Sequence, residues 1–186
     1  MALQKKGNLK QLRMVRNILP QNVECIFVRQ SEQLGLGHAV LCADRVVGND
    51  PFVVILADDF LFSSSSNTTS ELIDAYQKST KSQLCVMEVN GSDISKYGVV
   101  KTKKNSLAVS TIVEKPRQDE APSNLASIGR YVLTPKIFNY LAEQNPGLDD
   151  EIQLTDSINS MAMKEGVEAI ELKAKRFDCG SVSGYL

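Results

Sequence analysis

Several features are scarce in this chain of 186 residues, and each absence removes a class of function. There is no tryptophan and one histidine, and the four cysteines are too far apart to form a Cys-x-x-Cys zinc motif. No apolar run approaches the ~18 residues of a membrane span, and the first ten residues lack the apolar core of a secretory signal. A cytoplasmic location is therefore expected, with reduced, buried thiols at Cys25, Cys42 and Cys85.

The charge balance also excludes several partners. The formal net charge is −1, and no basic patch alternates with aromatic residues, so neither nucleic acid nor a membrane surface is an expected partner. Hydrophobic residues make up 42% of the chain and charged residues 23%, which is typical of a globular protein. The length suits one domain that covers residues 1–186.

Hydrophobic periodicity predicts an α/β fold. A helical stripe covers residues 8–19, and then strands and helices alternate up to residue 89, which is typical of βα units with a parallel sheet. After residue 97 the pattern changes, because two strand-like runs joined by a short polar loop predict an inserted antiparallel hairpin. The expected strands are 23–28, 52–56, 83–89, 98–102, 107–114, 126–133 and 167–172, and further helices are expected at 36–47, 70–79 after a cap at Thr69 or Ser70, 135–144 and from 149.

Two carboxylates follow the apolar strand 52–56. Ligands of α/β sheets bind at the carboxyl ends of the strands, so Asp58 and Asp59 stand where a metal–phosphate complex could be held. The simpler interpretation is that both residues only form a turn at the end of the strand. Asp178, some 120 positions later, also ends a predicted strand, and it could share one Mg²⁺ with Asp58 if the two strand ends lie close together.

Three further motifs are weak when each is taken alone. The glycines at 35 and 37 suit a close backbone approach to a ligand, but the spacing matches neither a dinucleotide fingerprint nor a P-loop. His38 lacks an adjacent nucleophile and is interpreted as a structural residue at a helix start. Glu114 and Lys115 point to opposite faces of a strand end, so they suit either sugar hydroxyls and a phosphate or bulk solvent.

Taken together and in order, eight segments resemble one family, the bacterial UTP–glucose-1-phosphate uridylyltransferases, also called UDP-glucose pyrophosphorylases. The resemblance covers essentially the whole chain. The segments are Val28–Gln30, Gly35–Ala43, Val54–Asp59, Lys96–Val100, Val113–Pro116, Gly129–Pro135, Glu151–Asp156 and Phe177–Gly180.

The resemblance implies a Rossmann-like nucleotidyltransferase fold with a mixed, mostly parallel sheet and the inserted hairpin. It implies formation of UDP-glucose and pyrophosphate from UTP and glucose 1-phosphate with Mg²⁺. By the same resemblance, Gln30 and the backbone at Gly35 would recognise uracil, while Gly98, Glu114 and Lys115 would meet glucose and its phosphate. Asp58 and Asp178 would hold the metal, and Asp58, Lys115 and Asp178 would carry the catalysis.

The chain also departs from this family. Nothing in it resembles the family's first strand, its Gly-x-Gly-Thr-Arg loop or its Pro-x-x-Lys segment, and it stops soon after Phe177–Gly180. It is therefore expected to be an N-terminally truncated fragment with little or no activity by itself, and to self-associate as a homo-oligomer because a sheet edge is left unpaired. The alternatives are a non-catalytic sugar-nucleotide-binding remnant and a related pyrophosphorylase that uses another nucleotide, such as dTTP, or another sugar.

Overall fold

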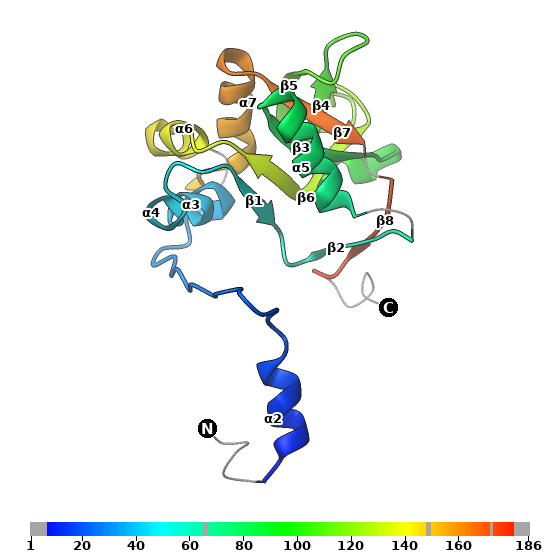
Figure 1. Ribbon diagram of the computed structural model, residues 1–186. Helices are drawn as coiled ribbons and strands as arrows, with labels where there is room; N and C mark the ends of the chain where they lie inside the picture. The colour runs from blue at the N-terminus through cyan, green and yellow to red at the C-terminus, as the bar shows by residue number, and fades with distance from the viewer. Residues whose placement is uncertain (1–6, 65–66, 148–149, 172, 181–186) are drawn as a thin grey trace.

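The computed structural model describes residues 7–64, 67–147, 150–171 and 173–180. Helices and strands both occur along this length, as the hydrophobic pattern predicts, but they alternate one by one only between residues 59 and 102 (Figure 1). None of the helices in these ranges is long and apolar enough to cross a membrane. The helices are α2 (Leu9–Arg16), α3 (Gly35–Leu41), α4 (Asp44–Val47), α5 (Thr68–Ser79), the 3₁₀ helix η1 (Gly91–Lys96), α6 (Ile137–Glu143) and α7 (Leu154–Lys164). The strands are β1 (Phe52–Ile55), β2 (Asp59–Phe62), β3 (Ser82–Glu88), β4 (Gly98–Thr102), β5 (Val109–Glu114), β6 (Leu125–Leu133), β7 (Val167–Glu171) and β8 (Lys175–Asp178).

The main sheet is mixed, and it contains the expected hairpin. Its order is β5-β4-β6-β3-β7, with β1 paired to the far end of β6, while β2 and β8 form a separate two-stranded sheet. The expected predominance of parallel pairs is wrong for the described strands. Only β3 and β7 pair in parallel there, because β6 runs antiparallel to each of its neighbours β1, β3 and β4.

The predicted strand at 23–28 is absent. These residues form no strand, and the exposed fractions of Ile26 and Phe27 are 66% and 94%. The segment from α2 to α3 extends away from the sheet (Figure 1). An apolar, β-branched sequence becomes a strand only where a neighbouring strand accepts its backbone hydrogen bonds, and this segment has no such neighbour among the described residues. Cys25 is consequently exposed rather than buried.

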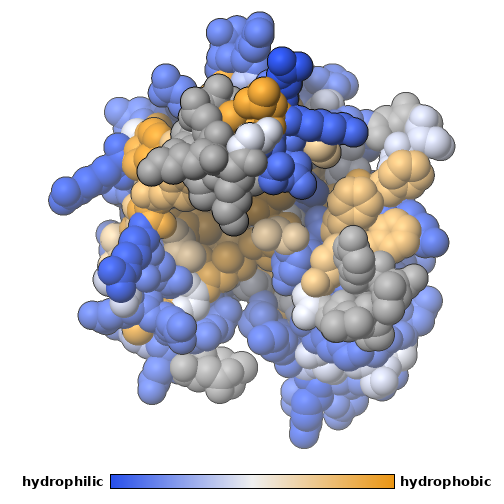
Figure 2. Space-filling model, turned by 90° about the horizontal axis from the view of Figure 1, so that it is seen from below, coloured by the Kyte–Doolittle hydropathy of each residue, from blue (hydrophilic) through white to orange (hydrophobic). Residues whose placement is uncertain are grey.

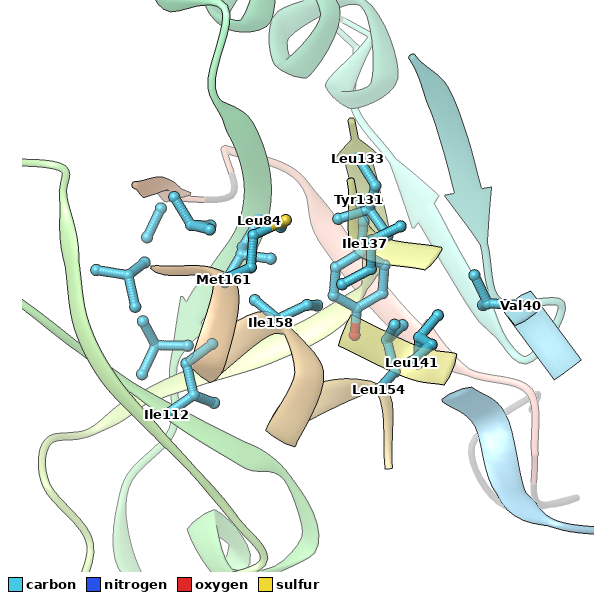
Figure 3. Packing of buried hydrophobic residues seen from close by; sticks show 14 of the residues in the cluster. Val40, Leu84, Ile112, Tyr131, Leu133, Ile137, Leu141, Leu154, Ile158 and Met161 are labelled. Carbon is cyan, nitrogen blue, oxygen red and sulfur yellow. The ribbon is translucent and has the colours of Figure 1, made fainter. Parts of the chain in front are cut away.

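The core lies on both faces of the sheet, as expected of an α/β fold. Helices α3, α6 and α7 pack together over one face, and α5 covers the other. Side chains therefore alternate between two apolar clusters along a strand: Leu84 and Val86 belong to the larger cluster, and Cys85 between them belongs to the smaller one. The larger cluster is completed by Tyr131 of β6, by Ile137 of α6 and by other residues of α6 and α7 (Figure 3).

Three helix starts differ from the sequence-based expectation, and one of them is α6, which begins at Ile137 rather than at residue 135. Helix α5 is capped by Asn67, whose side-chain oxygen accepts hydrogen bonds from the backbone N–H groups of Thr69 at 3.0 Å and Ser70 at 3.3 Å. Helix α7 begins at Leu154 rather than near residue 149, which itself lies outside the described residues. The delay has a cause: Ile152 donates its N–H to Leu34 and accepts the N–H of Gly37, so its backbone is engaged with α3 instead of a helix.

Candidate functional site

The small β2–β8 sheet brings the two predicted metal ligands together. Asp59 of β2 lies directly opposite Asp178 of β8, and the backbone oxygen of Asp58 accepts the N–H of Cys179 at 2.7 Å. Gly180 lies between the two side chains, because a Cβ at that position would be 3.1 Å from Asp178 Oδ1 and 3.5 Å from Asp58 Oδ2. Two residues 120 positions apart in the sequence thus present exposed carboxylates to one small space.

Asp59 has a different role from the turn residue that the sequence suggested. It is buried, accepts the N–H of Gly129 at 2.6 Å and accepts Nε–H of Arg176 at 2.5 Å. The Arg176 guanidinium also forms an ion pair with it. Burial alone would lower the pKa of Arg176, but the hydrogen bond and charge of Asp59 outweigh burial and raise this pKa. The ion pair therefore joins β2 to β8, and the hydrogen bond from Gly129 fastens this small sheet to β6.

A cavity of about 260 Å³ opens beside these strand ends. It is lined by residues from β4, β5, β6, α7 and the β2–β8 sheet, so segments from most of the chain converge on it. Four of the predicted site residues share this lining: Asp58, Gly98, Glu114 and Asp178.

Glu114 is held in place by a residue that the sequence did not single out. The Thr155 hydroxyl donates a hydrogen bond to Glu114 Oε2 at 2.7 Å. Both side chains face Gly98, where an added Cβ would lie 3.0 Å from Glu114 Oε2 and 3.2 Å from Thr155 Oγ1. The signal for Thr155 was its position inside the segment Glu151–Asp156, but that segment alone did not show which carboxylate its hydroxyl meets.

Lys115 is not brought into the cavity in the described structure. Its side chain is exposed, and it is absent from the cavity lining. Its backbone has a φ of +42°, in the left-handed region that side chains disfavour, and its N–H donates to the Tyr97 oxygen at 3.0 Å. Pro116, which follows, has a restricted φ, so the turn is held by this hydrogen bond on one side and by the proline on the other. Lys115 therefore lies at the margin of the site, next to Glu114.

Gln30 and Gly35 meet at the start of α3. Gln30 Nε2 lies 3.0 Å from the Gly35 oxygen and 3.0 Å from His38 Nδ1, so these two contacts use both amide hydrogens. The Gln30 oxygen remains to accept a hydrogen bond from a ligand. His38 thus orients an amide, in keeping with the structural role expected for it. Neither Gln30 nor Gly35 lines the cavity, but Leu36, the next residue, does.

The fold and the site define a class of protein. The sequence model of the nucleotidyl transferase family matches residues 2–186, and the chain belongs to this family. Within it, the chain is 43% identical to UTP–glucose-1-phosphate uridylyltransferase 2 of Streptococcus pyogenes serotype M3, over 99% of this chain and 63% of that protein. The chain therefore spans less than two thirds of the length of this relative.

Solved structures show the same likeness. One is a UDP-glucose pyrophosphorylase complexed with UDP-glucose, with a TM-score of 0.84 and 41% identity over 98% of this chain and 69% of that one. Another is the UTP-bound enzyme from Acinetobacter baumannii, with a TM-score of 0.85 and 39% identity over 99% of this chain and 65% of that one. The Rossmann-like nucleotidyltransferase fold expected from the sequence is confirmed by these matches.

Proposed function

We propose that this chain supplies the sugar-nucleotide site of a UTP–glucose-1-phosphate uridylyltransferase, which forms UDP-glucose and pyrophosphate from UTP and glucose 1-phosphate. The observation that carries the proposal is the convergence of Asp58, Asp178, Gly98 and Glu114 on one cavity. The relatives' names and the UDP-glucose and UTP complexes of similar structures support it.

The metal in this proposal is Mg²⁺, held by Asp58 and Asp178. No cluster of three or more His, Cys, Asp or Glu side chains suited to a metal occurs in the described ranges. Two carboxylates nevertheless fit, because Mg²⁺ is commonly bound by one or two carboxylates with water and substrate phosphate oxygens as the other ligands. When bound, the ion would neutralise phosphate charge. Gly180 leaves room for it, since a Cβ there would contact both carboxylates.

The protein residues then act by positioning. Glu114, oriented by Thr155, would accept hydrogen bonds from glucose hydroxyls, and Gly98 would let the sugar approach the backbone. Lys115 would meet the sugar phosphate from the margin of the site, and Gln30 would read the base with its free amide oxygen. A phosphate oxygen of glucose 1-phosphate attacks the α-phosphorus of UTP and pyrophosphate leaves, so no covalent bond to the protein is needed.

Two further features belong to the proposal. The first is a cytoplasmic location. The second is a homo-oligomer, supported by the exposed apolar residues between α2 and α3 and by Ile55, Phe60 and Phe62, whose exposed fractions are 55 to 58%. Seen from below, the surface shows orange apolar groups among blue polar ones (Figure 2).

The test is calorimetric titration of the chain with UDP-glucose, with and without Mg²⁺, beside a coupled assay of pyrophosphate release. We expect binding that Mg²⁺ strengthens. We expect little or no turnover, because these 186 residues contain no Gly-x-Gly-Thr-Arg segment to surround the leaving pyrophosphate. Absence of binding to UDP-glucose, UTP and glucose 1-phosphate would refute the proposal, and full turnover would refute the expected inactivity.

A second candidate is a binding module that keeps the pocket without the chemistry. The observation in its favour is that Asp58, Gly98, Glu114 and Asp178 line one cavity, while these 186 residues contain no Gly-x-Gly-Thr-Arg segment. Binding without any turnover, even after addition of a separately expressed N-terminal part of such a relative, would favour this second candidate. Restored turnover would favour the enzyme.

A further inference from the structure

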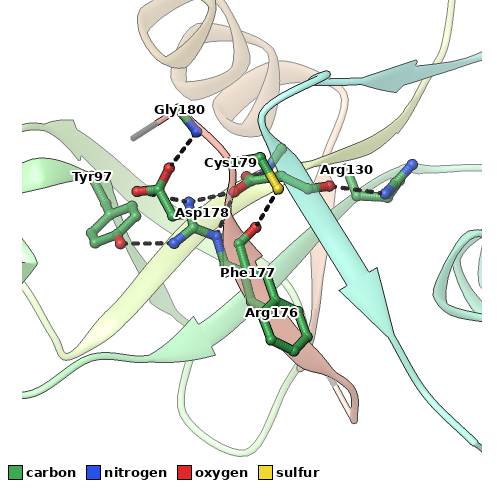
Figure 4. A network of polar contacts seen from close by, with 9 residues as sticks. Tyr97, Arg130, Arg176, Phe177, Asp178, Cys179 and Gly180 are labelled. Atoms are coloured by element: carbon green, nitrogen blue, oxygen red, sulfur yellow. Dashed lines mark hydrogen bonds and ion pairs between the residues drawn. The ribbon is translucent and has the colours of Figure 1, made fainter. Parts of the chain in front are cut away.

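One side chain joins the metal side of the cavity to its sugar side. Arg176 of β8 donates Nε–H to Asp59 Oδ1 at 2.5 Å and Nη1–H to the Tyr97 hydroxyl at 2.9 Å (Figure 4). Its guanidinium carbon also lies 5.2 Å from the centre of the Tyr97 ring. The third nitrogen, Nη2, lies 4.0 Å from Asp178 Oδ2. Three groups from three segments, Asp59, Tyr97 and Asp178, therefore meet at this guanidinium.

Burial restrains the Arg176–Asp59 pair, whereas Asp178, the proposed metal ligand, is exposed. The side chains of Arg176 and Asp59 are only 13% and 6% exposed, and Asp59 is fixed to β6 by the N–H of Gly129. The Asp178 side chain is 50% exposed; it accepts the Gly180 N–H at 3.0 Å and lies 4.0 Å from Arg176 Nη2. The position of Asp178 thus depends on how β8 is held, and Arg176 holds it.

Tyr97 extends the junction to the other half of the cavity. It directly precedes Gly98 at the start of β4, and its backbone oxygen accepts the N–H of Lys115. The hydroxyl reaches Arg176 while the backbone borders the proposed sugar site. Any shift of β8 is therefore transmitted through a hydrogen bond and a ring contact to the residues that would hold glucose and its phosphate.

We infer that Arg176 is a positioning residue for divalent-cation binding: it fixes Asp178 through Asp59 and Tyr97 without touching the ion. The inference rests on the proposed function. The positioning role and the positive charge of Arg176 predict opposite effects of Arg176→Met on the affinity for the divalent cation. Removing a cation near two carboxylates would by charge alone tighten cation binding. Releasing Asp178 from its support weakens binding, by about 10- to 100-fold for partners of metal ligands.

The experiment is a titration of the full chain with Mn²⁺, followed by electron paramagnetic resonance, with Mg²⁺ as competitor. Arg176→Met is expected to weaken Mn²⁺ binding by about tenfold or more, and Arg176→Lys by less, because it keeps one donor of the fork. Tyr97→Phe keeps the ring, loses the hydrogen bond and is expected to weaken binding by roughly two- to fivefold. Lys175→Met is the matched control, since it removes an exposed cation of the same strand that does not line the cavity.

A double variant separates positioning from folding. Arg176→Met leaves Asp59 buried and unpaired, which destabilises the fold, whereas Asp59→Asn with Arg176→Met removes both charges together. The thermal midpoint of the double variant is expected to recover most of the loss, while its Mn²⁺ affinity stays low. Two outcomes would overturn the inference and leave the proposed metal site standing. The first is a double variant whose Mn²⁺ affinity recovers together with its thermal midpoint. The second is an Arg176→Met variant that binds Mn²⁺ as tightly as wild type or more tightly. A wild-type chain that binds no Mn²⁺, with or without UDP-glucose, overturns the inference together with the proposed metal site.

Discussion

Thr155 donates its hydroxyl hydrogen to the Glu114 carboxylate over 2.7 Å and so joins the first turn of α7 to the end of β5. The contact closes one wall of the cavity, because both side chains also border Gly98. A carboxylate that has this one donor is oriented, and its remaining lone pairs point to whatever occupies the cavity.

Thr155→Val is therefore expected to weaken UDP-glucose binding by about tenfold. A hydrogen bond to a charged group contributes about 1.5–3 kcal/mol, and valine keeps the shape of threonine while leaving Glu114 without its donor. Calorimetric titration measures the effect. Thr155→Ser is the control, because it keeps the hydroxyl and should bind within about threefold of wild type. Equal affinities for the valine variant and wild type would show that Glu114 does not need this orientation.

Asp58→Asn tests the metal assignment from the opposite side of the cavity. The Asp58 side chain is exposed, so its charge is expected to add little to the free energy of unfolding, but the loss of one anionic ligand should weaken Mn²⁺ binding by about tenfold or more. Asp50→Asn, in the exposed turn before β1, is the matched control for the change in net charge. A cation affinity unaltered by Asp58→Asn would remove Asp58 from the site.

Much of the site was predictable because its residues stand at ends of elements. Asp58 follows a short apolar strand, and Glu114 ends a predicted strand two residues before Pro116, so sequence position already placed both at a sheet margin. The distance between Asp58 and Asp178 was not predictable, because it depends on the antiparallel register of β2 and β8, two strands of four residues each. Their pairing is long-range, and neither strand has a periodicity strong enough to reveal it.

The failures have a common physical origin, which is competition from a tertiary partner. Residues 23–28 have a strand-like sequence, but none of the described strands lies beside them. Residues before Leu154 could begin a helix, but the backbone of Ile152 is engaged by α3. Asp59 resembles a turn residue, yet Arg176, 117 positions later, donates a hydrogen bond to it and forms an ion pair with it. Each local preference was weak, and the contact that decided the outcome lay far away in the sequence.

The close contact of α3 with the segment before α7 yields a stability prediction. A Cβ at Gly37 would lie 2.5 Å from the Ile152 oxygen and 2.9 Å from Leu141 Cδ2. The Ile152 oxygen cannot easily retreat, since it accepts the Gly37 N–H at 2.8 Å. Gly37→Ala is therefore expected to lower the free energy of unfolding by about 1–3 kcal/mol, although alanine is intrinsically the better helix former by about 1 kcal/mol.

Urea unfolding followed by circular dichroism measures this loss. Gly91→Ala provides the comparison, because no atom lies within 4 Å of its Cβ position and its φ of +72° isolates the backbone cost, about 1 kcal/mol. A Gly37→Ala variant as stable as wild type would mean that the two segments separate freely. In that case Gln153, Leu154 and Thr155 would not be held at the cavity by this contact.

Two buried groups contribute to the loss of stability at alkaline pH. Burial raises the pKa of the Cys85 thiol from 9.0 to about 12, and burial likewise raises the pKa of the Tyr131 hydroxyl from 10.0 to about 12. In both cases the folded protein keeps its proton at a pH where the unfolded chain has lost it. The stabilisation is therefore complete below pH 9 and is lost as the pH rises from 9 to 12.

The free energy of unfolding is expected to fall by about 1.4 kcal/mol per pH unit for each such group in this range. Tyr131→Phe keeps the ring in the core, so its curve should decline less steeply than that of wild type above pH 10, whereas the two curves should run parallel between pH 6 and 9. The difference between the curves isolates Tyr131 from the lysines, which also lose protons at high pH.

At pH 8 a thiol reagent should modify exposed Cys25 in the native protein and leave Cys85 unmodified until the chain unfolds. Parallel curves up to pH 11 would contradict the burial of the Tyr131 hydroxyl, and early modification of Cys85 would contradict the close packing of α5 on the sheet.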